Sequence, residues 1–121
     1  MPGAKFVGEV KCSQAMYDEL AKAGGQIEMW KVGHSLIKAR MKETGAALAG
    51  EMSGHTFFGE RWYGFDDGLY AGARLLELLT RVADPSALLN ALPMAISTPE
   101  LHLHLNEGEN FALIEKLGLR R

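Results

Sequence analysis

The sequence predicts an α/β domain of three layers, in which helices cover both faces of a small, mixed sheet. The sheet is expected to be mostly parallel, with about four strands, the last of them antiparallel. Two observations predict this class. Short apolar runs alternate with segments of helical spacing along the first fifty residues, and glycines close most of these segments. Helices between consecutive strands require crossover connections, which join parallel strands.

The predicted strands are short apolar runs. Three of them, residues 6–11, 26–32 and 46–49, lie in the first half of the chain. Residues 101–105 alternate strictly between leucine and histidine, which is typical of a strand with one buried face. The stretch 54–64 is rich in aromatic residues and glycine, and it is compatible either with a hairpin or with a long ordered loop.

The predicted helices begin at residues whose side-chain oxygens can accept a first-turn N–H group. These N-cap candidates are Ser13, Ser35, Asp66 and Asp84. The corresponding helices are expected to end at Gly24, at Gly45, near Thr80 and near Pro93, because glycine tolerates the left-handed conformation of a helix end and proline cannot continue a helix.

Leucine patterns assign inner faces to two of the helices. The helix that begins at Asp66 is the longest and carries Leu69, Leu76 and Leu79 on one side. A last helix at about residues 109–117 would turn Phe111, Ile114 and Leu117 inward.

Length and composition indicate one globular domain over residues 1–121. Hydrophobic residues make up 47% of the chain and charged residues 23%, and no apolar run is long enough to cross a membrane. The single cysteine, Cys12, allows no internal disulfide and favours a cytoplasmic location. The net charge of -2, with scattered basic residues, argues against a nucleic-acid partner.

Polar residues follow each of the first three predicted strands. Lys11 ends the first strand, His34 follows the second, and Glu51, Ser53 and His55 follow the third. In a parallel α/β sheet these strand ends meet at one edge, where ligands bind. A carboxylate, a hydroxyl and cationic groups together suit a polyhydroxylated, negatively charged ligand.

Four blocks of sequence resemble the α-D-phosphohexomutase superfamily. Residues 50–55, Gly-Glu-Met-Ser-Gly-His, are similar to its sugar-binding loop, and residues 10–12, 30–35 and 60–68 resemble further blocks of its third domain in the same order. With methionine at position 52, this loop is similar to the loop of bacterial phosphomannomutase/phosphoglucomutase enzymes, which accept both mannose and glucose phosphates. Val32 departs from the threonine that is frequent before the Gly-His-Ser motif of the family.

The resemblance implies roles for individual residues. Glu51 and Ser53 are expected to bind the 3- and 4-hydroxyls of the sugar, with Gly50 and His55 beside it, although His55 could equally support the loop. Lys11 and His34 become candidates for general acid/base catalysis or charge stabilisation near the reacting hydroxyl.

The resemblance also implies that most of the catalytic machinery is absent from these 121 residues. The family transfers a phosphoryl group between the 1- and 6-positions of mannose or glucose phosphates, using a phosphoserine, a Mg²⁺ loop of spaced aspartates and a phosphate-binding loop. No such motif occurs here. We therefore expect an isolated domain III that is not catalytic and holds no cofactor, with Mg²⁺ bound by another domain of the parent enzyme.

Two alternatives remain open at this point. The chain could be a free-standing module that binds or senses sugar phosphates, or a structural remnant without affinity for them. In the leading interpretation its partners are hexose phosphates, such as mannose or glucose 1- and 6-phosphate, and the other domains of the parent enzyme, with no nucleic acid or membrane partner.

Other polar residues favour structural interpretations. His102 and His104 lie two apart, a spacing that can bind a metal, but the sequence offers no third ligand and we expect exposed strand histidines. Cys12 stands beside Lys11, which could lower its pKa, but a buried structural thiol is the simpler expectation.

Overall fold

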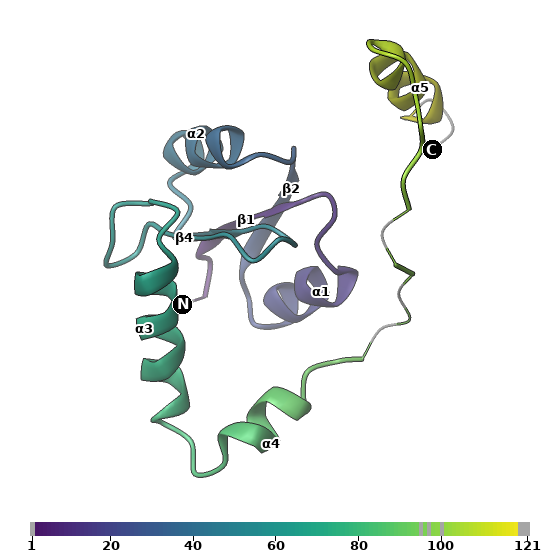
Figure 1. The fold of residues 1–121 in the computed structure, drawn as a ribbon. Helices are drawn as coiled ribbons and strands as arrows, with labels where there is room; N and C mark the ends of the chain where they lie inside the picture. The colour runs from purple at the N-terminus through teal and green to yellow at the C-terminus, as the bar shows by residue number, and fades with distance from the viewer. Residues whose placement is uncertain (1, 95, 97, 100, 119–121) are drawn as a thin grey trace.

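The computed structural model describes residues 2–94, 96, 98–99 and 101–118. Figure 1 shows a central sheet with helices packed around it, followed by an extended C-terminal segment. The strands are β1 Lys5–Glu9, β2 Gln26–Trp30, β3 Leu48–Gly50 and β4 Thr56–Phe58. The helices are α1 Gln14–Lys22, α2 His34–Thr44, α3 Gly68–Leu79, α4 Pro85–Asn90 and α5 Glu109–Gly118.

The sheet has the strand order β2-β1-β3-β4. β1 pairs in parallel with both β2 and β3, while β4 is antiparallel to β3. The predicted class, a mostly parallel mixed sheet of four strands, is confirmed. The stretch 54–64 contains the second strand of a hairpin, since β4 follows β3 after only five residues.

The register of the strands places different helices on the two faces of the sheet. Val7 lies opposite Ala49, and Ala49 lies opposite Phe57, so these three side chains share one face. They form the core together with Ile37 and Met41 of α2, and with Ala46, which follows α2.

The other face carries α1 and α3. Gly8 alternates with Val7 along β1, and a Cβ placed on it would meet the side chain of Tyr17 from α1. Phe58 of β4 packs edge-on against Tyr70 of α3, with ring centroids 5.4 Å apart. Helices therefore cover both faces, which gives the three layers.

Two of the four predicted N-caps are confirmed and two are displaced. Ser13 accepts from the N–H of Ala15, and Asp84 accepts from that of Ala87. The helix predicted from Ser35 begins instead at His34, with Gly33 as N-cap at a φ of 125° that disfavours other residue types. The helix predicted from Asp66 is capped by Asp67, whose carboxylate accepts from the N–H of Tyr70.

The predicted strand at residues 101–105 is wrong. This segment lies outside the sheet and is exposed, and Figure 1 shows it in the long connection between α4 and α5. Alternation describes a strand with one buried face, but a strand also needs a neighbour to accept and donate its backbone hydrogen bonds. No described residue provides such a neighbour here.

Several predicted inner faces are also exposed. Helix α5 forms where it was predicted, but Phe111, Ile114 and Leu117 all face solvent. On α3, Leu79 is partly buried, whereas Leu69 is 90% exposed and Leu76 is also exposed. Within the described residues, no helix has the length and apolar character needed to cross a membrane.

Replacing Ile37 by alanine should test the core beneath α2. Ile37 is 0% exposed and lies in the cluster with Val7 and Phe57, so truncation leaves a cavity. We expect Ile37→Ala to lower the free energy of unfolding by about 2–5 kcal/mol in urea titrations. Leu36→Ala, at an exposed neighbouring position, is the control and should change it by less than about 1 kcal/mol. Equal losses for the two variants would contradict this account of the core.

A second stability test compares two glycines. A Cβ on Gly8 would lie 2.7 Å from the Tyr17 hydroxyl oxygen, which is held in place because it donates to the Glu9 carbonyl. Gly8→Ala should therefore destabilise the chain by about 1–3 kcal/mol. Gly72→Ala, in α3 with nothing within 4 Å, should stabilise it by about 0.4–1 kcal/mol. Thermal and urea unfolding would measure both, and a neutral Gly8→Ala would show that α1 does not pack closely on β1.

Candidate functional site

The candidate site residues follow the carboxyl ends of β1, β2 and β3. Lys11 lies two residues beyond β1, His34 is the first residue of α2, and Glu51 directly follows β3. Because these three strands are parallel, their carboxyl ends lie at the same edge of the sheet. The structure brings these residues to one edge, as the sequence predicted.

Glu51 joins two of the loops at this edge. Its Oε1 accepts a hydrogen bond of 2.9 Å from the backbone N–H of Gly33. This bond ties the segment after β3 to the start of α2 and brings Glu51 beside His34. A carboxylate offers about four acceptor positions, so a Glu51 that holds Gly33 can still accept hydrogen bonds from a ligand.

Glu9 joins the other pair of loops. This residue is 0% exposed, its Oε2 accepts from the N–H of Lys11 at 2.7 Å, and its Oε1 accepts from the N–H of Met52 at 3.0 Å. Sequence analysis missed Glu9. The available signal was a glutamate inside an apolar run that was itself predicted to be a buried strand, since a buried carboxylate requires partners.

Two further contacts hold the end of β1 in place. The Tyr17 hydroxyl donates to the Glu9 carbonyl at 2.8 Å, and burial raises the pKa of Tyr17 to about 12. The Cys12 thiol lies 3.7 Å from the Gly50 carbonyl oxygen, to which it donates. Burial also raises the pKa of the Cys12 thiol. Cys12 is thus partly buried rather than fully buried as expected, and its pKa is raised rather than lowered.

A tight turn presents the residues after Glu51. The N–H of Glu51 donates to the His55 carbonyl, and the N–H of Gly54 donates back to the Glu51 carbonyl, both at 3.0 Å. Gly54 has a φ of 94°, which glycine adopts without steric cost. Ser53 lies on this turn and is exposed to solvent.

His55 is paired with Asp66. The Nδ1 atom of His55 lies 2.7 Å from Oδ2 of Asp66. Since a carboxylate only accepts hydrogen bonds, this contact favours a proton on Nδ1 and leaves Nε2 as the other ring nitrogen for a ligand. The sequence interpretation of Asp66 as a helix cap missed this pair. Asp67 caps α3 instead, and Asp66 pairs with His55.

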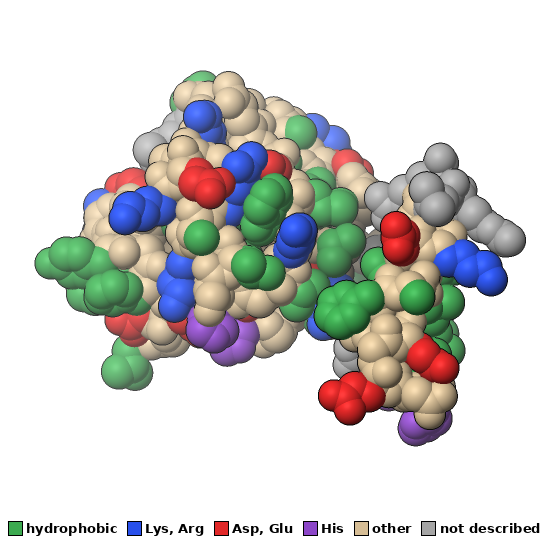
Figure 2. All heavy atoms as spheres, turned by 90° about the horizontal axis from the view of Figure 1, so that it is seen from above, with side chains coloured by type: hydrophobic (Ala, Val, Ile, Leu, Met, Phe, Trp, Pro, Cys, Tyr) green, Lys and Arg blue, Asp and Glu red, His purple; other side chains and the backbone are tan. Residues whose placement is uncertain are grey.

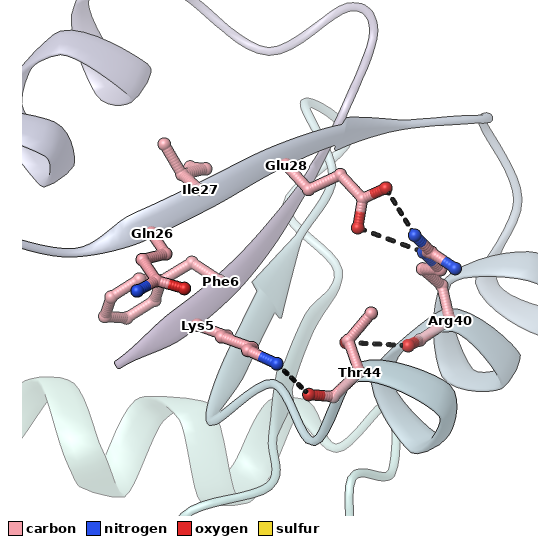
Figure 3. Close-up of a pocket in the computed structure, with 7 residues that line it drawn as sticks. All are labelled: Lys5, Phe6, Gln26, Ile27, Glu28, Arg40 and Thr44. Atoms are coloured by element: carbon pink, nitrogen blue, oxygen red, sulfur yellow. Dashed lines mark hydrogen bonds and ion pairs between the residues drawn. The ribbon is translucent and has the colours of Figure 1, made fainter. Parts of the chain in front are cut away.

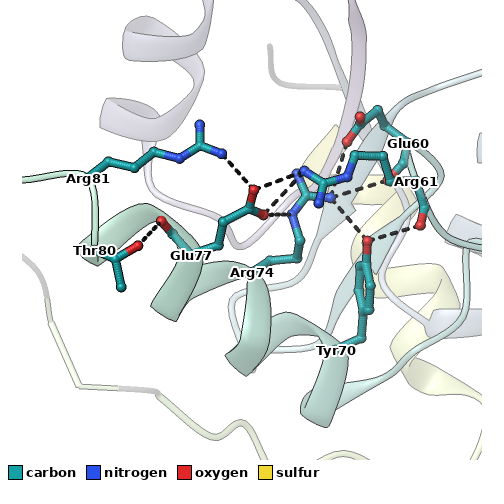
Figure 4. A network of polar contacts seen from close by, with 7 residues as sticks. All are labelled: Glu60, Arg61, Tyr70, Arg74, Glu77, Thr80 and Arg81. Atoms are coloured by element: carbon teal, nitrogen blue, oxygen red, sulfur yellow. Dashed lines mark hydrogen bonds and ion pairs between the residues drawn. The ribbon is translucent and has the colours of Figure 1, made fainter.

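The segment that carries Asp66 is fixed by charged residues of α3 (Figure 4). Arg74 contacts Glu60 at 3.1 Å, and Arg61 contacts Glu77 at 3.2 Å. The hydroxyl of Tyr70 donates to the Arg61 carbonyl at 3.0 Å. These contacts hold the connection between β4 and α3, and with it the carboxylate that faces His55.

Lys11 and His34 present their side chains at the surface of this edge. Both residues are exposed, as are Ser53 and His55. The Nδ1 atom of His34 lies 3.5 Å from the Ser35 hydroxyl, on the first turn of α2. The site is therefore an open surface at one edge of the sheet, to which the exposed side chains of Lys11, His34, Ser53 and His55 and the Glu51 carboxylate all contribute.

A pocket of about 320 Å³ lies at the opposite edge of the sheet (Figure 3). Its charged groups already pair with each other, since Arg40 binds both carboxylate oxygens of Glu28 at 2.7 and 3.0 Å. Lys5 donates to the Thr44 carbonyl at 3.1 Å. These contacts join α2 to β1 and β2, and we assign the pocket a structural role.

The described residues do not gather three or more histidine, cysteine, aspartate or glutamate side chains around a point where a metal ion could bind. His102 and His104, the spacing noted in the sequence, lie in an exposed segment without strand structure.

Comparison with known proteins identifies the family. Residues 1–95 match the family model described as phosphoglucomutase/phosphomannomutase, alpha/beta/alpha domain III. The chain is 54% identical to a phosphoglucomutase of Neisseria gonorrhoeae over 120 residues, which cover 98% of the chain and 26% of that protein. It is 53% identical to a phosphomannomutase/phosphoglucomutase of Pseudomonas aeruginosa, over 96% of the chain and 25% of that protein.

A solved structure agrees with the sequence relatives. The chain matches a phosphoglucomutase/phosphomannomutase family protein from Burkholderia thailandensis with a TM-score of 0.87 and 61% identity, over 98% of this chain and 24% of that one. The chain thus spans about a quarter of the length of the relatives that it matches. Its fold, sequence and length together make it a member of the phosphoglucomutase/phosphomannomutase family that corresponds to α/β/α domain III.

Proposed function

We propose that this chain is the sugar-recognition domain of a phosphomannomutase/phosphoglucomutase, an enzyme that interconverts hexose 1-phosphates and hexose 6-phosphates. The observation that carries the proposal is the hydrogen bond from Gly33 to Glu51. It sets a carboxylate between two loops of the sheet edge, beside an imidazole and a hydroxyl. A carboxylate in this setting is suited to accept hydrogen bonds from neighbouring hydroxyls of a sugar.

The residues of the edge would divide the work. Glu51 and Ser53 bind sugar hydroxyls, while Gly50 and His55 lie beside the ring, with Asp66 orienting the imidazole. Lys11 and His34 are the groups available for proton transfer or charge stabilisation near the reacting oxygen. Their exposure is consistent with a ligand that approaches from solvent.

We place the remaining chemistry in other parts of a longer polypeptide. Phosphoryl transfer depends on positioning and on neutralisation of phosphate charge by metal ions and cationic side chains. The sequence contains neither the Mg²⁺ loop nor the phosphoserine and phosphate-binding motifs of the family. The chain by itself would bind sugar phosphates without interconverting them. The single cysteine of this chain favours a cytoplasmic location for it.

Exposed apolar side chains support partnership with other domains. The leucines of α3 and α4 and the apolar residues of α5 expose hydrophobic surface to solvent, which is unfavourable and typical of a surface that contacts another domain. Figure 2 shows hydrophobic side chains on the surface of the main body and of the C-terminal part. On α3, α4 and α5 the exposed apolar residues are Leu69, Leu75, Leu76, Leu78, Leu88, Leu89, Phe111, Ile114 and Leu117. The single domain over residues 1–121 stays a prediction, since the family match ends at residue 95.

Titration with α-D-mannose 1-phosphate tests the proposed function. We expect the backbone amide resonances of Gly33, Glu51 and Ser53 to shift, with a dissociation constant of roughly millimolar size because the phosphate-binding parts are lacking. Glu51→Gln removes the charge that strengthens hydrogen bonds to the sugar, and it should weaken binding by about tenfold or more.

Glu19→Gln is the matched control for this titration. Glu19 is exposed on α1 and pairs only with Lys22 among the described contacts, so its replacement should leave binding unchanged. Equal affinity of Glu51→Gln and the unaltered chain would exclude Glu51 as the hydroxyl ligand. A complete lack of response in the unaltered chain would favour the structural remnant instead.

Charged substitutions on α3 test the proposed domain contact. Leu69 and Leu76 are exposed, so the double variant Leu69→Glu/Leu76→Glu should change the free energy of unfolding by only about 0.5 kcal/mol per site. It should reduce binding of a hydrophobic dye and any self-association seen in sedimentation. Unfolding of this variant would show that the face is part of the core of the chain.

A further inference from the structure

We infer that Glu9 is a positioning residue that sets the two halves of the sugar-binding edge relative to each other. This inference rests on the proposed function, because it concerns the geometry of the loops that would bind the sugar. Glu9 itself lies beneath the edge and is fully buried, so it would act through Lys11 and Met52 rather than by touching a ligand.

The Glu9 carboxylate is shared between two loops. One oxygen accepts from the N–H of Lys11, after β1, and the other accepts from the N–H of Met52, after β3. Lys11 and Met52 are 41 residues apart in the sequence, yet the side chain of Glu9 accepts from the N–H groups of both. A hydrogen bond to an ionised acceptor is short and strong, and each of these bonds also fixes the direction of its peptide group.

Burial of the Glu9 carboxylate has a desolvation cost. Burying a carboxylate away from water is unfavourable unless hydrogen bonds replace its hydration. Glu9 shares its face of the sheet with Val7, at a position where an apolar side chain would satisfy the core. The carboxylate contributes what an apolar side chain cannot, because it offers acceptors for the N–H groups of both Lys11 and Met52.

A second carboxylate extends this connection between the loops to α2. Met52 follows Glu51, whose own carboxylate accepts from the N–H of Gly33. Two carboxylates in succession therefore link the loop after β1, the loop after β3 and the start of α2, where His34 lies. The backbone of Glu9 is fixed in turn by the Tyr17 hydroxyl and by the N–H of Cys12, both of which donate to its carbonyl. A change at Glu9 should thus reach Lys11 and Glu51 while the sheet stays intact.

Glu9→Gln tests this role with little change of shape. The amide keeps one acceptor oxygen but presents its NH₂ group to the other N–H, so one of the two loops must lose its hydrogen bond. We expect the amide of Lys11 or Met52 to exchange with solvent at least tenfold faster. The affinity for α-D-mannose 1-phosphate, followed at Glu51 and Ser53, should fall at least fivefold.

Two further variants separate positioning from stability. Glu9→Asp keeps both acceptors on a shorter side chain and should bind mannose 1-phosphate more weakly than the unaltered chain but more tightly than Glu9→Gln. If Glu9→Gln does not fold, the aspartate variant carries the test, with an expected loss of about two- to fivefold. Ile37→Val loosens the core beneath α2 without touching the edge, and it should leave both the affinity and the exchange of the Lys11 and Met52 amides unchanged.

The outcomes distinguish the two proposals. A folded Glu9→Gln with unchanged exchange at Lys11 and Met52, or with unchanged affinity, would overturn the role of Glu9 and leave the proposed function standing. An affinity that falls equally in Ile37→Val would also overturn it, because binding would then follow stability alone. Absence of any response to mannose 1-phosphate in the unaltered chain would overturn the proposed function itself.

Discussion

The parallel order of β2, β1 and β3 is the constraint on which the site depends. Helices α1 and α2 return the chain to the amino edge after each strand, so all three strands deliver their following residues to the opposite edge. The core face holds β1, β3 and β4 together, because Val7, Ala49 and Phe57 line up across these strands and pack against Ile37. Trp30, at the end of β2, packs against the same cluster. Residues that are distant in sequence therefore come to one edge of the sheet.

Backbone groups organise the edge, and exposed side chains provide its chemistry. The N–H groups of Lys11, Gly33 and Met52 are each held by a carboxylate. The side chains of Lys11, His34, Ser53 and His55 remain at the surface. For the proposed sugar binding this separation would be favourable, since the backbone that carries the candidate ligand groups is ordered in advance and less conformational entropy would be lost on association.

Sequence patterns predicted the layers, the parallel strands and the edge where the candidate residues lie, because those features follow from periodicity and from chain connection. They failed where a tertiary contact decides between local alternatives. Ser35 is a good N-cap by type, but the positive φ of Gly33 ends the loop two residues earlier. Asp66 and Asp67 are both able to cap α3, and only the position of His55 assigns one of them elsewhere. Alternation at residues 101–105 reports a preference for a sheet, yet no described strand lies beside it.

The same reasoning explains why the glutamate in β1 was overlooked and why leucines on α3 were predicted to be buried. Periodicity describes which side of an element is apolar, but not what covers that side. Glu9 is buried because two loops close over it, and Leu69 is exposed because none of the described residues packs over it. The chain spans about a quarter of its relatives, and uncovered apolar helix faces are the form expected of a domain that packs against neighbouring domains. Under the proposed function, affinity for the sugar ring would reside in this edge, whereas affinity for the phosphate group would come from other parts of the parent enzyme.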